Sequence, residues 1–111
     1  MDEDVIVVTT NSIPGYRIVR VLGLVSASSA RARGAGRDIV ASIRNLIGGE
    51  VVEYKELMES ARDDALQELK KRARSLGANA VVGVRMATSM ITAGVAEVVW
   101  YGTAVVVEPE Y

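Results

Sequence analysis

The stretch from Arg33 to Arg37, Arg-Gly-Ala-Gly-Arg, combines two glycines with two guanidinium groups just ahead of an expected helix. Backbone N–H groups at a helix start, together with arginines, can hold a phosphate-like anion. The stretch has neither the third glycine of a dinucleotide-binding fingerprint nor the Lys-Ser/Thr pair of a P-loop. A flexible hinge or a contact between subunits explains it as well, so the residues leave these structural roles and an anion site open.

Acid–base and metal chemistry are limited by the absence of both cysteine and histidine from the 111 residues. Their absence excludes disulfides, thiolate metal sites and every catalytic arrangement built on a Ser-His or Cys-His pair. Asp38, Glu53 and Tyr54 fall near expected helix ends, where carboxylates commonly stabilise the helix dipole. Asp63 and Asp64 are adjacent, so on a helix their side chains diverge by about 100° and do not share one ion unaided. We therefore predict no catalytic residue, no metal ligand and no cofactor, and an enzyme is the last function that the residues support.

A long helix, predicted from Glu53 to Gly77, would position many of these groups. Apolar residues recur there every three or four positions, while charged residues fall elsewhere around the cylinder. Acids lie toward its start and bases toward its end, as the helix dipole favours. Gly77 supplies the left-handed conformation that commonly follows the last helical turn. The predicted buried stripe consists of Leu57, Ala61, Ala65, Leu69, Ala73 and Leu76.

Four strands and a shorter helix complete the predicted elements. Runs rich in β-branched residues, bounded by turn residues, predict strands over Val5–Val8, Arg17–Ala27, Asn79–Ala87 and Val95–Val107. Residues 11–15 are predicted to form a turn and residues 88–94 a loop. An apolar stripe between Arg37 and Ile47, followed by two glycines, predicts the short helix. Gly23, inside the second strand, indicates a bulge, a bend or a closely approaching backbone.

Apolar residues on both faces of the strands carry the main structural inference. In the second strand, Ile18, Leu22 and Leu24 alternate with Val19, Val21 and Val25. Two helices can cover only one face of a small sheet, and the other face would then be a larger exposed apolar patch than soluble monomers normally tolerate. We therefore predict a homo-oligomer that associates through this other face or through the strand edges.

Length, composition and charge predict one soluble domain over residues 1–111. The formal net charge of −1 gives no general reason to expect a nucleic-acid partner. The chain starts with acids where a signal peptide needs bases, and no apolar run approaches the length of a membrane span. We expect a cytoplasmic protein without a membrane partner. Six arginines and one acid lie between Arg17 and Arg44, followed by an acidic run, and this unevenness indicates complementary surfaces on neighbouring subunits.

Three segments together resemble the YbjQ-like family, whose members are often labelled heavy-metal-binding domains. They are VVTTNSIPGYRIVRVLGLV near the start, RDIVASIRNLIGGEVVEYKELMESARDDALQELKKRARSLGANAVVGVR in the middle and YGTAVVVE near the end. The most specific parts are the spacing SIRN..GG..EY...L..AR..AL..L...A..LGANAVVGV and the closing GTAV. The resemblance covers nearly the whole chain.

The resemblance implies a two-layer, dodecin-subunit-like α+β subunit, with one long and one short helix on a mainly antiparallel sheet. It also implies assembly into a homopentameric ring and no established activity. Because cysteine and histidine are missing, no metal ligand is carried over, and a metal-binding function is disfavoured. An assembly or binding module is the first expectation, with a small anionic ligand at the subunit interfaces as the alternative. The motif residues that would form such a site, or serve assembly geometry instead, are Arg37, Asp38, Ser42, Arg44, Tyr54 and Arg62.

Overall fold

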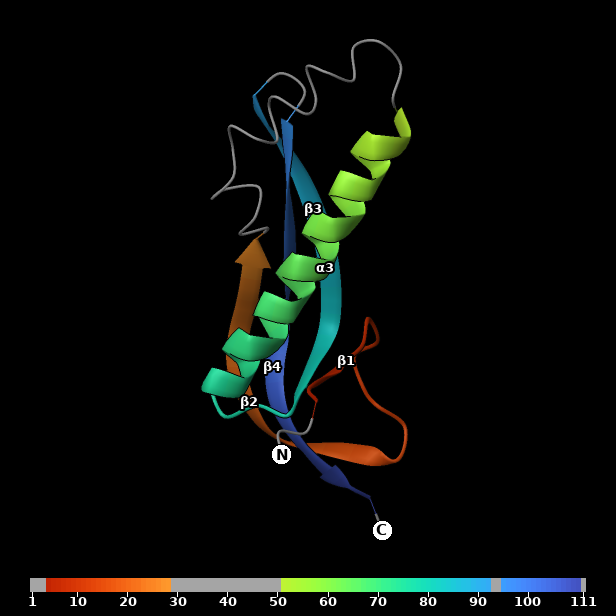
Figure 1. Cartoon of the computed structure of the whole chain (residues 1–111). Coiled ribbons are helices and arrows are strands. Elements are labelled where there is room, and N and C mark those ends of the chain that lie inside the picture. The colour runs from red at the N-terminus through yellow and green to blue at the C-terminus, as the bar shows by residue number, and fades with distance from the viewer. Residues whose placement is uncertain (1–3, 29–50, 93–94, 111) are drawn as a thin grey trace.

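The computed structural model of the chain describes residues 4–28, 51–92 and 95–110 (Figure 1). One helix within these ranges, α3 (Val51–Ser75), lies on a four-stranded sheet. The strand order is β1-β3-β4-β2, with β2 and β3 antiparallel to β4 and β1 parallel to β3. This mixed sheet with a helix on one face is the predicted α+β class, and the predicted short helix lies outside the described residues. The strands are β1 (Ile6–Val7), β2 (Tyr16–Ser28), β3 (Ala80–Thr92) and β4 (Val95–Pro109).

The four predicted strands are confirmed, but the loop predicted over residues 88–94 is wrong over its first five positions. There β3 continues through Thr92, which is paired with Val95 of β4. Backbone pairing with β4 keeps this polar stretch extended, because strand formation depends on the neighbouring strand more than on intrinsic propensity. The result is a long β3–β4 hairpin that extends beyond β1.

Helix α3 confirms the predicted buried stripe at four of its six positions, and the side chain of Leu57 lies outside the described set. Ala65, Leu69 and Ala73 are fully buried, and Ala61 is nearly so. The stripe prediction is wrong at its last member, because Leu76 follows the end of the helix and is 50% exposed. No helix within the described ranges is long and apolar enough to cross a membrane.

The C-terminal end of α3 is closed by a Schellman motif at Gly77. The Gly77 N–H donates to the Arg74 carbonyl at 2.9 Å, and the Ala78 N–H donates to the Ala73 carbonyl at 3.0 Å. Gly77 adopts a φ of 92°, which a residue with a Cβ atom disfavours. The predicted left-handed stop is therefore present, and it turns the chain directly into β3.

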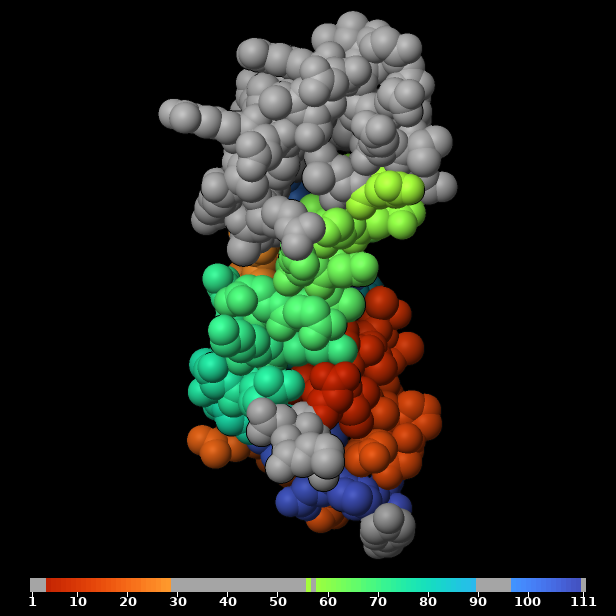
Figure 2. Space-filling view, in the orientation of Figure 1, coloured from red at the N-terminus to blue at the C-terminus, as the bar shows by residue number. Residues whose placement is uncertain are grey.

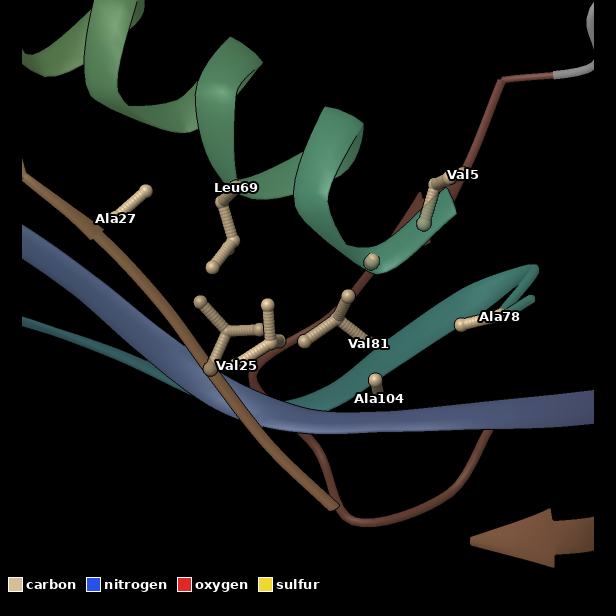
Figure 3. Packing of buried hydrophobic residues seen from close by; sticks show 9 residues of the cluster. Val5, Val25, Ala27, Leu69, Ala78, Val81 and Ala104 are labelled. Carbon is tan, nitrogen blue, oxygen red and sulfur yellow. The ribbon is translucent and has the colours of Figure 1, made fainter. Parts of the chain in front are cut away.

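The core between α3 and the sheet is built from a few large side chains among small ones. Leu69 points from the helix toward Val25 of β2 and Val81 of β3 (Figure 3). Alanines along the helix let its axis approach the sheet closely. Nine buried residues form this cluster, namely Val5, Val25, Ala27, Leu69, Ala73, Ala78, Val81, Val84 and Ala104.

A second, smaller core lies on the sheet face opposite α3. Val82 and Val105 belong to it, and the chain's own N-terminal segment packs against it through Val8 and Ile13, among others. This segment runs beside β3, with the Val8 N–H donating to the Val81 carbonyl at 3.0 Å. Part of the second apolar face is therefore covered within one chain, which the sequence reasoning did not anticipate.

The N-terminal segment is anchored at both of its ends. At its start, the Lys70 ammonium donates a hydrogen bond of 3.1 Å to the Asp4 carboxylate and lowers the pKa of that carboxyl. At its end, the Tyr16 N–H donates to the Ile13 carbonyl at 3.0 Å across Pro14 and Gly15, which has a φ of 85°. Proline followed by a glycine with positive φ is typical of a type II turn, and the turn predicted for this stretch is present. Figure 2 shows the first residues of the segment lying beside the C-terminal half of α3.

Candidate functional site

The structure places few of the predicted ligand-binding residues. Arg37, Asp38, Ser42 and Arg44 lie outside the described residues. Tyr54 belongs to the first turn of α3, but its side chain is also outside the described set. Arg62 is half-buried, and its backbone carbonyl accepts a 3.0 Å hydrogen bond from the Trp100 indole N–H. The proposed grouping of these six residues therefore stays a prediction.

The donor groups of the chain do not fit a heavy-metal ion. Soft metals select thiolate and imidazole ligands, and the sequence has no cysteine and no histidine. Among the residues that the structure describes, no group of three or more carboxylates lies close enough together to hold an ion. Asp63 is exposed and Asp64 half-buried on α3, and their adjacent positions on the helix direct them apart.

The surface that stands out is on β2, where two bulges change which residues share a face. Along the β2–β4 pair the register shifts between Ile18 and Arg20 and again between Val21 and Gly23. Val19 and Leu22 are therefore the extra residues of the two bulges. In Figure 1 the strand begins at the lower right of the view, passes below the C-terminal end of α3, bends and then runs up beside β4.

These bulges place apolar residues that are three positions apart on one face. Ile18, Val21 and Leu24 stand opposite Val107, Val105 and Thr103, which alternate along β4 and so share a face. Val105 and Val107 belong to the core on the side away from α3, so the three β2 residues point to that side as well. Their side chains are 39%, 65% and 76% exposed, respectively.

Tyr101 of β4 extends this surface. It lies two residues from Thr103, points to the same face and is 39% exposed. We call Ile18, Val21, Leu24 and Tyr101 the outer apolar row. It is an apolar part of the face opposite α3 that the N-terminal segment leaves accessible.

The charged groups of β2 are both basic. Arg17 and Arg20 are exposed, and residues 16–28 include no acid. The Arg17 guanidinium lies 3.5 Å from the Glu108 carboxylate of β4, with both side chains more than half exposed. Such an exposed pair contributes little to stability. Arg17 and Arg20 stand opposite Glu108 and Val106 of β4, so the β2 margin presents apolar groups on one face and positive charge on the other.

Strict alternation had assigned the members of the row to different faces. The sequence reasoning grouped Leu22 with Leu24 and Val21 with Val25, whereas Leu22 packs against the helix-side core and Val25 is buried in it. Gly23, which adopts a φ of 114° at the second bulge, was the available signal. A glycine inside a strand indicates that the alternation can change there, but it does not say how many residues are inserted.

Comparison with protein families places the chain in a defined group of relatives. The YbjQ family model, described as "Putative heavy-metal-binding", matches residues 5–108. A UPF0145 protein of Thermococcus kodakarensis is 55% identical over 108 residues, which are 97% of this chain and 96% of that protein. A UPF0145 protein of Thermus thermophilus is 45% identical over 106 residues, which are 96% and 93% of the two chains.

A solved structure supports the fold independently of these sequences. The chain is similar to a crystal structure from Pediococcus pentosaceus ATCC 25745, described as a protein with unknown function of the DUF74 family. The TM-score is 0.60, and the match covers 94% of this chain and 98% of that one. At 21% identity, this likeness concerns the fold alone.

Proposed function

The chain belongs to the YbjQ family, and we propose that it is a homo-oligomeric assembly module whose subunits associate through the outer apolar row. The assembly we propose is the ring of five copies that the family resemblance implies. One observation supports the self-association most directly, namely the exposure of Val21 and Leu24 in a single chain. Because the donor groups do not fit a heavy metal, the proposal assigns no metal to the module.

The physical argument rests on what covers each face of the sheet. Helix α3 covers one face, and the N-terminal segment covers part of the other. The row then remains in contact with water, although fully burying a Val or Leu side chain contributes about 1.5–3 kcal/mol. Association with another copy would bury these side chains without any further folding of the chain. Contiguous apolar surface of this kind is typical of interaction sites.

Light scattering coupled to size-exclusion chromatography tests the proposal at micromolar concentration. We expect the wild-type protein to show about five times the chain mass of 11.9 kDa. Leu24→Lys should give a smaller species, because association would bury an unpaired ammonium group. A monomeric wild-type protein would refute the proposal.

A matched control distinguishes the effect of a lysine in the row from the effect of a lysine at any exposed leucine. Leu76 is 50% exposed at the end of α3 and lies outside the row, so Leu76→Lys should leave the mass unchanged. Circular dichroism should show native secondary structure for both variants. A Leu24→Lys variant that keeps the wild-type mass would remove the row from the interface.

A further inference from the structure

We infer that the outer apolar row of one copy docks on a different surface of the next copy, the helix-side flank of β3. This inference rests on the proposed self-association and names the two surfaces that meet. We call Met86 and Thr88, on the α3 side of β3, the β3 flank. In this arrangement the β2 margin of one sheet overlaps the β3 margin of its neighbour.

The β3 flank is an uncovered part of the face that α3 otherwise protects. Met86 is paired with Trp100 and Thr88 with Val98, and directly opposed residues of an antiparallel pair share a face. Trp100 packs against the core under α3, and its indole N–H bonds to the helix backbone. Met86 therefore lies on the helix side, yet it is 42% exposed.

The position of α3 explains this exposure. The helix packs mainly over β2 and β4, and β1 pairs with the first two residues of β3, Ala80 and Val81. The later residues of β3 thus form a sheet margin with an accessible apolar residue on the helix side. A methionine at such a position can adapt to an incoming apolar surface.

The two exposed surfaces lie at opposite margins of the sheet and on opposite faces. The row is at the β2 margin and points away from α3, whereas the β3 flank is at the other margin and points toward the α3 side. One copy can therefore place its β2 margin over the β3 margin of the next. Such a contact uses two different surfaces of the same chain, and its repetition closes a ring where the rotation allows.

Two other ways of pairing copies fit the structure less well. A two-fold contact of the row with itself would leave the β3 flank exposed on both chains. Extension of one sheet into the next through the β2 edge is opposed by the bulges at Val19 and Leu22. Bulges bend an edge strand and interrupt its pattern of hydrogen-bonding groups, and proteins use them to block pairing between edges.

Charge complementarity also favours a second copy of this chain. Two packed layers lie about 10 Å apart. A β2 margin that overlaps the neighbour's β3 margin on the helix side would therefore lie about as far from the neighbour's sheet as the neighbour's α3 does. The bond from Trp100 to the Arg62 carbonyl places that turn of α3 near the level of Met86. Glu59 and Asp63 are exposed on either side of this turn. Arg17 and Arg20 project from the face of the β2 margin opposite the row, and in this arrangement they would lie beside the neighbour's helix rather than against its sheet. Opposite charges at such a contact favour the correct partner and orientation.

Cysteine cross-linking tests the inference cleanly, since the chain has no cysteine of its own. Leu24→Cys and Met86→Cys should each resist a short bis-maleimide reagent when expressed alone. Co-expressed, the two variants should give a covalent dimer on a denaturing gel. Co-expression of Leu24→Cys with Leu76→Cys is the matched control and should give no dimer.

The outcomes separate this inference from the proposed function. Cross-linking of Leu24→Cys with itself, or its failure with Met86→Cys in a sample of oligomeric mass, would overturn the docking surface and leave self-association standing. A monomeric mass for the unmodified protein would refute the self-association as well. Charge reversal gives an independent readout: Arg20→Glu and Asp63→Arg should each weaken association roughly fivefold or more at low salt, and their combination should restore it. A combination that associates no better than the single variants would overturn the proposed orientation.

Discussion

Replacing Leu69 with alanine tests the packing of α3 on the sheet most directly. Leu69 is fully buried and points between β2 and β3. The substitution removes three carbon atoms, which at about 0.8 kcal/mol each correspond to roughly 2.4 kcal/mol of transfer free energy. The surrounding side chains are mainly alanine and valine, which are too short or too stiff to fill the space, so a cavity term is added. We expect a total loss of about 3 to 5 kcal/mol.

Thermal unfolding followed by circular dichroism measures this loss. For a domain of this size, about 4 °C of melting temperature corresponds to 1 kcal/mol, so we expect a decrease of roughly 12–20 °C. The measurement should be repeated at several protein concentrations, because subunit association raises the apparent stability of an oligomer. Urea titration at fixed protein concentration gives an independent value.

The neighbouring residue Glu68 provides the matched control. Its carboxylate lies 3.1 Å from the Arg72 guanidinium, one turn later on the exposed side of α3, and the side chain is 33% exposed. An i,i+4 pair of this kind contributes about 0.3–0.5 kcal/mol, so Glu68→Ala should lower the melting temperature by about 2 °C or less. An unchanged melting temperature for Leu69→Ala would show that the helix does not pack on the sheet through this stripe.

Three further predictions concern other parts of the molecule. Gly102→Ala should destabilise the protein by about 1–3 kcal/mol in urea titration, because the added Cβ would lie 2.8 Å from Val81 Cγ1 and 2.9 Å from Val84 Cγ2; a neutral effect would contradict this packing. The Lys70 hydrogen bond lowers the pKa of Asp4, so its stabilising effect should be present above the unfolded pKa near 4 and disappear as pH falls through the lower folded value. Asp4→Asn should accordingly melt below the wild type at pH 7 and level with it at pH 2, and a difference that persists at pH 2 would assign the effect to something other than this ion pair. Calorimetric titration with zinc near neutral pH should show no submicromolar site, given the missing thiolate and imidazole ligands, whereas a stoichiometric tight site would mean that carboxylates suffice.

The long helix was predictable because its signals are local. The spacing of Ala65, Leu69 and Ala73 follows the helical period, and Gly77 ends the helix through its own backbone preference. Leu76 lies beyond the last turn of α3, where the helical period no longer determines which side chains are buried. The same local reasoning does not say which apolar residues of β2 share a face, because this depends on how β2 pairs with β4. The grouping of the six predicted ligand residues stays a prediction.

Tertiary structure alone decided which apolar residues face solvent. The grouping of Ile18, Val21 and Leu24 on one face follows from two bulges, and their positions depend on the pairing of β2 with β4, some 80 residues later in the chain. The exposure of Met86 depends in the same way on where α3 crosses the sheet. Sequence periodicity reports how polar and apolar residues alternate along one segment. Which side of a segment is covered is settled by segments far away in the chain, and in this protein those contacts separate the core from the surface that we propose for assembly.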